Sequence, residues 1–197
     1  MRGLDERIQR IKMLILDVDG VMTDGGIILG PGSMELKRFD ARDGMGIALA
    51  RAAGLRIAIL TIRDSEAVRR RAMELGIDEV QQGLLHKEEG YQAILKKHGL
   101  KDEEVAYIGD DIPDIPILRR AGLSICVADG AEETKQVSHY VTRRRGGEGA
   151  VREVVEMLLD GMGKKEEAIL SVLNPTKREG VKKTKMQTPD GGMSEKM

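Results

Sequence analysis

Short apolar segments that alternate with glycine-ended helical segments constrain the fold of this chain more than any other feature. Four helical-looking stretches each end in Gly followed by an aliphatic residue, at Ala53-Gly54-Leu55, Leu75-Gly76-Ile77, His98-Gly99-Leu100 and Ala121-Gly122-Leu123. Glycine often ends a helix because it adopts the left-handed conformation without steric strain. Each of these sites therefore predicts the C-terminus of a helix.

The apolar segments between these helices predict buried strands. They are short, lack polar alternation and cover residues 13–16, 57–60, 105–108 and 125–127. Runs of this kind are typical of strands buried on both faces, as in a parallel sheet covered by helices. Strands that alternate with helices form βαβ units. The sequence thus predicts an α/β fold with a parallel sheet sandwiched by helices.

One segment interrupts the alternation. Residues 25–39, GGIILGPGSMELKRF, contain two β-prone stretches around Gly30-Pro31-Gly32-Ser33, and this turn chemistry predicts an inserted β-hairpin. The insert is too short to be a separate lid domain. Residues 147–159 carry apolar side chains at helical spacing and close the predicted domain, which spans residues 1–160.

The last part of the chain has a different composition. Residues 161–197 contain many lysines, scattered Gly and Pro, and few large apolar residues. They predict a charged, flexible C-terminal tail, in which only the stretch EEAILSVL has the pattern of one or two amphipathic turns.

The overall composition argues for a globular chain and against nucleic acid or a membrane as its partner. Hydrophobic residues make up 41% and charged residues 33% of the 197 residues, and the formal net charge of −1 gives no general electrostatic case for nucleic acid or an anionic membrane. The charged N-terminus lacks the apolar region of a signal peptide, and no stretch approaches transmembrane length, so we expect a cytoplasmic protein.

The single cysteine, Cys126, lies in an apolar run and predicts a buried structural thiol.

Polar residues follow several of the apolar runs, and in open α/β sheets ligands bind beyond the carboxyl ends of the strands. Lys87 begins a helical segment after a weaker strand-like stretch at residues 80–82. The other candidates are Asp17 and Asp19 after the first run, Thr61, Arg63 and Asp64 after the second, and Asp110, Asp111 and Asp114 after residues 105–108. We expect these side chains to converge on one edge of the sheet.

Convergent carboxylates repel one another unless a hard cation neutralises them. Mg²⁺ takes oxygen ligands and is commonly bound by one or two carboxylates together with a substrate phosphate. Thr61 and Lys87 are suitable partners for phosphate oxygens. Asp17 is then a candidate nucleophile on phosphorus, and Asp19 a candidate proton donor and acceptor.

Other interpretations of these residues remain open at the level of single motifs. Asp-x-Asp-Gly is often only a turn, Thr61 could cap a helix, and Lys87 could begin a solvated helix. A phospho-accepting receiver domain would place its acceptor after the third strand, where the segment QQGLLHK has no Asp. A catalytically silent regulatory domain is a further alternative, against which the intact set of polar residues argues.

Taken together, the motifs resemble those of the haloacid-dehalogenase (HAD) superfamily of phosphohydrolases. Residues 17–23, DVDGVMT, are similar to its first motif, Thr61 to the second, Lys87 to the third, and residues 109–114, GDDIPD, to the fourth. The resemblance implies a HAD-like, Rossmann-like fold.

Residues 8–160 further resemble the 3-deoxy-D-manno-octulosonate 8-phosphate (KDO 8-phosphate) phosphatases. The similar segments are DVDGVMTDGGI, ELKRFDARDGMGI, RDSEAVRRRAMELGI and GGEGAVREV. The resemblance implies a Mg²⁺-dependent phosphomonoesterase without a separate cap domain. It also implies a homotetramer in which the hairpins associate and a neighbouring subunit helps to close each active site.

The same resemblance implies a role for each candidate. Asp17 would form an aspartyl phosphate and bind the metal, and Asp19 would act as general acid and base and offer its backbone carbonyl to the metal. The remaining roles fall to Asp110 as a direct metal ligand, Thr61 and Lys87 on the phosphate, Asp111 and Asp114 in support, and Arg63 with residues 146–152 near the sugar acid or a subunit boundary.

Two positions depart from the family pattern. Ile62 stands where the family usually has Gly, and Glu148 stands where a basic residue is common. An acid that points at a carboxylated substrate would disfavour it. The same chemistry on another sugar phosphate, such as a nonulosonate 9-phosphate, is therefore the alternative substrate assignment.

Overall fold

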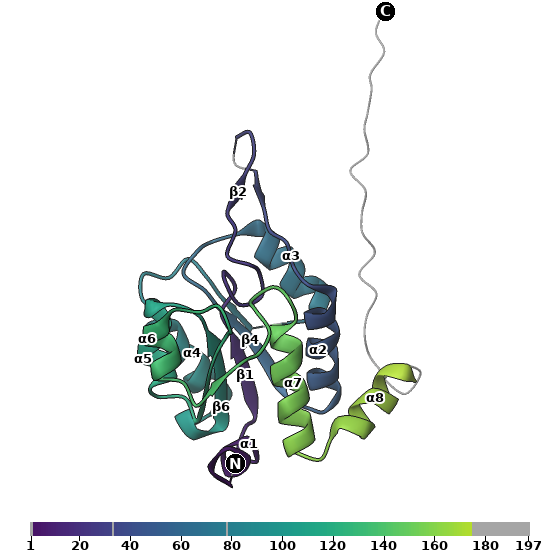
Figure 1. Cartoon of the computed structure of the whole chain (residues 1–197). Coiled ribbons are helices and arrows are strands. Elements are labelled where there is room, and N and C mark those ends of the chain that lie inside the picture. The colour runs from purple at the N-terminus through teal and green to yellow at the C-terminus, as the bar shows by residue number, and fades with distance from the viewer. Residues whose placement is uncertain (1, 33, 78, 175–197) are drawn as a thin grey trace, which may run out of the picture.

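The computed structural model describes residues 2–32, 34–77 and 79–174, and its centre is a parallel sheet covered by helices on both faces (Figure 1). The sheet has the strand order β5-β4-β1-β6-β7-β8, and every neighbouring pair is parallel. The strands are β1 (Met13–Leu16), β4 (Arg56–Leu60), β5 (Glu79–Gln81), β6 (Val105–Gly109), β7 (Leu123–Cys126) and β8 (Tyr140–Val141). The predicted α/β fold is confirmed.

Helices pack on the two faces of this sheet in two separate apolar clusters. The first cluster involves α1 (Arg2–Ile8), α2 (Ala41–Ala52), α3 (Glu66–Leu75), α7 (Ala150–Gly161) and α8 (Lys165–Leu173). The second involves α4 (Lys87–His98) and α5 (Ile115–Leu118), and Figure 1 shows α6 (Glu132–Gln136) beside them. Along β1, Leu14 and Leu16 join the first cluster while Met13 and Ile15 join the second, and all four are fully buried. This burial on both faces explains the lack of polar alternation.

The register of the central strands brings their carboxyl ends level. Leu16 at the end of β1 pairs with Ile59 on one side and Ile108 on the other. The residues that follow β1, β4 and β6 therefore meet at one edge of the sheet, as the sequence predicts.

Three of the four predicted helix-ending glycines have the left-handed conformation. These are Gly54, Gly76 and Gly99, with φ of 84°, 65° and 62°. The prediction is wrong for Gly122, which has no positive φ, because α5 already ends at Leu118. A side chain at Gly122 would lie 2.6 Å from the carbonyl carbon of Glu103, so glycine is required there for close backbone contact.

The predicted hairpin is present and projects from the domain (Figure 1). It consists of β2 (Ile28–Leu29) and β3 (Glu35–Leu36), paired antiparallel with Ile28 opposite Leu36. Ser33, in the predicted turn, lies outside the described residues.

Part of the segment for which the sequence predicts a flexible tail is helical. Helix α8 contains the stretch EEAILSVL, and its Ala168 is fully buried in the core. Lys165 at its start pairs with Asp160 at 2.9 Å, which joins α8 to α7. A short apolar face is sufficient here because α2 and α7 provide the surface on which it packs. Residues 175–197 lie outside the described residues.

The structure also bears on the cysteine and on the membrane-spanning segments discussed above. Cys126 is a free, fully buried cysteine, which agrees with a structural thiol. Among the described residues, no helix has the length and apolar composition needed to span a membrane.

The start of α7 is capped by a side chain from another helix. The N-cap residue, Gly149, has no side chain, and the backbone N–H of Arg152 instead donates to Asp43 Oδ1 at 2.8 Å. Asp43 is 3% exposed, its second carboxylate oxygen has no partner, and burial raises its pKa to about 6. This contact fixes α7, and the loop that precedes it, against α2.

We predict that the Asp43 charge makes the stability of the protein depend on pH. The folded-state pKa of Asp43 lies above its unfolded value, so Asp43 contributes fully to stability below about pH 4, where it is protonated in both states. This contribution is lost as pH rises through about 6, and the free energy of unfolding falls by roughly 3 kcal/mol at most. Asp43→Asn keeps an acceptor oxygen and removes the charge. Urea unfolding should show this variant gaining stability over the wild type between pH 4.5 and 7.5.

Asp43→Ala is the control for the capping contact, because it removes the charge and the acceptor oxygen together, and it should be about 1 kcal/mol less stable than Asp43→Asn at both pH 4.5 and pH 7.5. A difference between Asp43→Asn and wild type that does not change with pH would contradict the assignment.

Candidate active site

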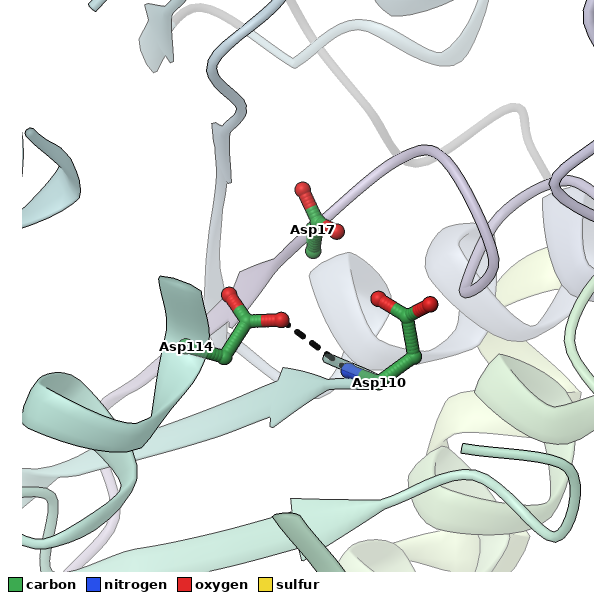
Figure 2. A group of neighbouring side chains, drawn as sticks. All are labelled: Asp17, Asp110 and Asp114. Carbon is green, nitrogen blue, oxygen red and sulfur yellow. Dashed lines mark hydrogen bonds between the residues drawn. The ribbon is translucent and has the colours of Figure 1, made fainter. Parts of the chain in front are cut away.

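Three carboxylates lie together at the carboxyl edge of the sheet (Figure 2). Asp17 follows β1 and is 5% exposed, Asp110 follows β6 and is half-buried, and Asp114 is the last residue of the short 3-10 helix η2 (Ile112–Asp114). One oxygen from each lies within 4.8 Å of the other two. This distance is suitable for shared coordination of a cation.

The electrostatics of the cluster favour a cation. Burial raises the pKa of Asp17, and the nearby Lys87 ammonium opposes only part of that rise. Burial also raises the pKa of Asp110, with further contributions from the charges of Asp17 and Asp114. Crowded carboxylates of this kind are stabilised in the ionised form by a hard divalent cation with oxygen ligands. The residues present therefore fit a metal such as Mg²⁺.

Lys87 supplies the positive charge that the protein itself brings to the cluster. Its side chain is 4% exposed, and Nζ lies 2.8 Å from Asp17 Oδ1 and 2.5 Å from Asp114 Oδ1. Burial alone would lower the pKa of Lys87, but the charges of these two carboxylates raise it overall. The ammonium is thus held charged next to Asp17.

Both carboxylate oxygens of Asp114 accept hydrogen bonds from the protein, so this residue mainly holds its neighbours in place. Its Oδ1 accepts from Lys87 and from the hydroxyl of Tyr107 at 2.5 Å, and its Oδ2 accepts from the backbone N–H groups of Asp110 at 3.0 Å and Asp111 at 3.3 Å. The structure thus brings Asp114 into the cluster beside Lys87, and the supporting role that the resemblance implies for it stays a prediction. The Asp111 side chain is exposed and accepts from the N–H of Ile112 at 2.8 Å, so it shapes the η2 turn.

Tyr107 is a contributor to the site that the sequence analysis missed. It is fully buried within β6, and its hydroxyl donates to Asp114. The available signal was a tyrosine in an otherwise apolar run, because a buried tyrosine hydroxyl needs a partner.

The carboxylate of Asp19 is not part of the acidic cluster. It forms ion pairs with Lys37, from the hairpin, and with Arg63, whose Nε lies 3.7 Å from Asp19 Oδ2. Arg63 also donates to Glu35 Oε1 at 2.8 Å. Arg63 thus lies at the base of the hairpin, and Lys37 is a second contact that sequence reasoning missed.

Thr61 lies at the same edge as Asp17. It is 3% exposed, and its backbone N–H donates to the carbonyl of Gln81 at 2.9 Å, which continues the pairing of β4 with β5. Of the two positions that depart from the family pattern, Ile62 is 37% exposed and Glu148 is exposed, with its backbone carbonyl accepting from Arg42 at 3.2 Å.

Two glycines allow the loops around the cluster to close. Gly20 has a φ of 90°, and a side chain there would overlap the Asp110 carboxylate and lie 2.6 Å from its Cγ. A side chain at Gly146 would lie 2.5 Å from the carbonyl carbon of Gly20. Gly146 and Gly147 thus pack on the loop that follows Asp17 and Asp19, and the backbone N–H of Gly147 donates to the carbonyl of Val21 at 2.9 Å.

Comparison with known proteins agrees with this geometry. A family model described as haloacid dehalogenase-like hydrolase matches residues 72–154. The 3-deoxy-D-manno-octulosonate 8-phosphate phosphatase of Escherichia coli (strain K12) is 43% identical over 162 residues, which are 82% of this chain and 86% of that protein.

Solved structures of relatives have the same fold. The phosphatase of that name from Moraxella catarrhalis, in complex with a magnesium ion, a phosphate ion and a KDO molecule, is 40% identical with a TM-score of 0.84, covering 87% of this chain and 99% of that one. The one from Yersinia pestis is 42% identical with a TM-score of 0.81, covering 83% and 89%.

The fold and the acidic site define a HAD-like hydrolase. Within that class, the chain belongs to the family of 3-deoxy-D-manno-octulosonate 8-phosphate phosphatases. The predicted enzyme class, a hydrolase acting on phosphoric monoesters, is thereby confirmed.

We predict that Gly20→Ala impairs binding of a divalent cation by pushing Asp110 away. The matched control is Gly54→Ala, because Gly54 has a similar φ of 84° but nothing within 4 Å of an added side chain. Both substitutions should destabilise the protein by about 1 kcal/mol or more, because alanine adopts the left-handed conformation only with steric strain. MgCl₂ should raise the Tm of wild type and Gly54→Ala alike, and should raise that of Gly20→Ala much less. An equal Mg²⁺-dependent rise in all three proteins would contradict the steric role of Gly20.

Proposed function

We propose that this enzyme is a Mg²⁺-dependent phosphatase that hydrolyses KDO 8-phosphate to the free sugar acid and phosphate through an aspartyl-phosphate intermediate. The observation that carries the proposal is the placement of Asp17. Its carboxylate is buried at the sheet edge, paired with Lys87, and within reach of a cation shared with Asp110. Support for the substrate comes from the 43% identity to the E. coli phosphatase and from the bound KDO in the Moraxella catarrhalis relative.

The metal site would use the carboxylates of Asp17 and Asp110, together with the backbone carbonyl of Asp19. A bound Mg²⁺ supplies positive charge that neutralises the carboxylates and the phosphate oxygens. Lys87 orients the Asp17 carboxylate and adds its own positive charge, and the hydroxyl of Thr61 provides a hydrogen bond to a phosphate oxygen.

In the first half-reaction, an oxygen of Asp17 attacks the phosphorus atom. The bond between phosphorus and the ester oxygen breaks, and the departing sugar oxygen takes a proton from Asp19. In the second half-reaction, Asp19 takes a proton from a water molecule whose oxygen attacks phosphorus. The bond to Asp17 then breaks, and inorganic phosphate is released with both aspartates returned to their starting state.

Phosphate release from a panel of sugar phosphates tests the proposed substrate. We expect kcat/KM for KDO 8-phosphate to exceed that for generic phosphate esters by at least about 10²-fold, as expected for a site that recognises the sugar acid. Preference for a nonulosonate 9-phosphate would favour the alternative substrate. That alternative is tested because Ile62 and Glu148, which depart from the family pattern, are both exposed. Equal turnover of all esters would refute the specific assignment.

Asp17→Asn tests the chemistry in the same assay. We expect a loss of turnover on the order of 10³-fold or more, because the amide cannot form the intermediate. Undiminished Mg²⁺-dependent turnover in this variant would exclude Asp17 as nucleophile. A wild type without any phosphatase activity would favour the catalytically silent alternative.

We also propose that the protein is a homotetramer assembled through its hairpins. The hairpin exposes five large apolar side chains: Ile27, Ile28, Leu29, Met34 and Leu36, each at least half exposed. Contiguous exposed apolar side chains of this kind mark interaction surfaces. Association of hairpins would bury them beside the active site.

Two charged substitutions in the hairpin test this assembly. Ile28→Lys with Leu29→Lys should reduce the mass in solution from tetramer to smaller species, because each chain would have to bury two lysine ammonium groups in the contact. Light scattering coupled to size-exclusion chromatography measures the mass. Leu170→Lys, at a 60% exposed apolar position on α8, is the control and should leave the mass unchanged. A monomeric wild type, or a tetrameric double variant, would contradict the hairpin interface.

A further inference from the structure

Four charged side chains form a closed network between the hairpin and the loop after β1. Lys37 pairs with Asp19 and lies 3.6 Å from Glu35, while Arg63 pairs with Glu35 at 2.8 Å and with Asp19 at 3.7 Å. With Asp19 ionised, as it is once its proton has passed to the leaving group, two positive and two negative groups alternate and the network balances its own charge. Asp19 is its only member with a proposed part in proton transfer.

The burial of Lys37 distinguishes it from an ordinary surface lysine. Its side chain is 1% exposed, whereas the next residue, Arg38, is 64% exposed and pairs with Asp24 at the surface. A lysine ammonium is removed from water only at a substantial cost, unless carboxylates surround it. The contacts to Asp19 and Glu35 offset that cost, so the hairpin directs a buried positive charge specifically at Asp19.

We propose that Lys37 is a positioning residue that fixes the direction of the Asp19 carboxylate, and that the hairpin thereby controls proton donation to the leaving group. This inference rests on the proposed phosphatase chemistry and assigns Lys37 a part in it. Arg63 alone would hold Asp19 through a longer contact and from the other oxygen. Loss of Lys37 would therefore leave Asp19 free to rotate toward Arg63.

The expected defect depends on the leaving group. Attack by Asp17 does not involve Lys37, because Asp17 is held by Lys87 instead. Proton donation matters for esters with a basic leaving oxygen, where it contributes about 10²–10⁴-fold, and matters little when the leaving group is stable as an anion. A change at Lys37 should thus affect poor leaving groups selectively.

The test uses the Mg²⁺-loaded enzyme and a series of phosphate esters. Phenyl phosphate, p-nitrophenyl phosphate and 2,4-dinitrophenyl phosphate have similar shapes and increasingly good leaving groups, and KDO 8-phosphate is the alkyl ester. Comparison of kcat/KM is informative because it includes the leaving-group step and excludes release of phosphate. The aryl series also separates leaving-group effects from any contact with the sugar.

For Lys37→Met we expect kcat/KM to fall about 10²-fold with phenyl phosphate and KDO 8-phosphate, and less than about 3-fold with 2,4-dinitrophenyl phosphate. Lys37→Arg should restore most of the lost activity, because it can still pair with Asp19. Lys37→Gln should show the same selectivity to a smaller degree, and it replaces the Met variant if that protein does not fold. Arg38→Met is the matched control, with no selective loss.

An equal loss with every ester would overturn the proposal and assign Lys37 a merely structural role. Unchanged activity in Lys37→Met and Lys37→Gln would overturn it as well, while leaving the proposed function intact. A wild type that hydrolyses none of the esters would refute the proposed function itself, and the role of Lys37 with it.

Discussion

The mutual repulsion of three carboxylates at one sheet edge is the constraint on which the site depends. Lys87 supplies one positive charge, and Asp114 is satisfied by donors from Lys87, Tyr107 and two backbone groups. Asp17 and Asp110 remain with raised pKa values, so the folded protein holds them in an environment that favours a cation. A site of this kind is assembled at the expense of stability and is completed by what it binds.

Within residues 2–32, 34–77 and 79–174, the fold keeps these groups close without a separate cap domain. Level strand ends bring Asp17 and Asp110 together, Gly20 leaves room for the Asp110 carboxylate, and Gly146 lets a second loop pack over the first. The hairpin then reaches the site through Lys37. Its apolar surface and its buried lysine belong to one short insert, which links assembly to the active site in the proposal made here.

Much of the fold and the acidic cluster could be predicted from sequence because they obey local rules. Strands buried on both faces leave continuous apolar runs, and polar residues directly after parallel strands must meet at one edge. Asp17, Asp110, Asp114 and Lys87 were found in this way. The helix-ending role was wrong for Gly122, whose contact with Glu103 is set by tertiary packing.

The residues that sequence reasoning missed act across the fold. Asp43 caps a helix that begins more than a hundred residues later, and Lys37 reaches Asp19 only because the hairpin folds back. Neither has a spacing signature, because the distance along the chain between partners in such contacts is arbitrary. Helix α8 was underestimated for a related reason, since its short apolar face is stabilised by α2 and α7.

The central claim is that Asp17 takes the phosphoryl group beside a metal held with Asp110. A crystal structure of the enzyme with Mg²⁺ and beryllium trifluoride, a mimic of an acyl phosphate, measures this directly. The account predicts beryllium bonded to a carboxylate oxygen of Asp17, Mg²⁺ between Asp17 and Asp110, and a fluorine within hydrogen-bond distance of Lys87. Beryllium trifluoride on any other residue, or Mg²⁺ bound away from these carboxylates, would contradict it.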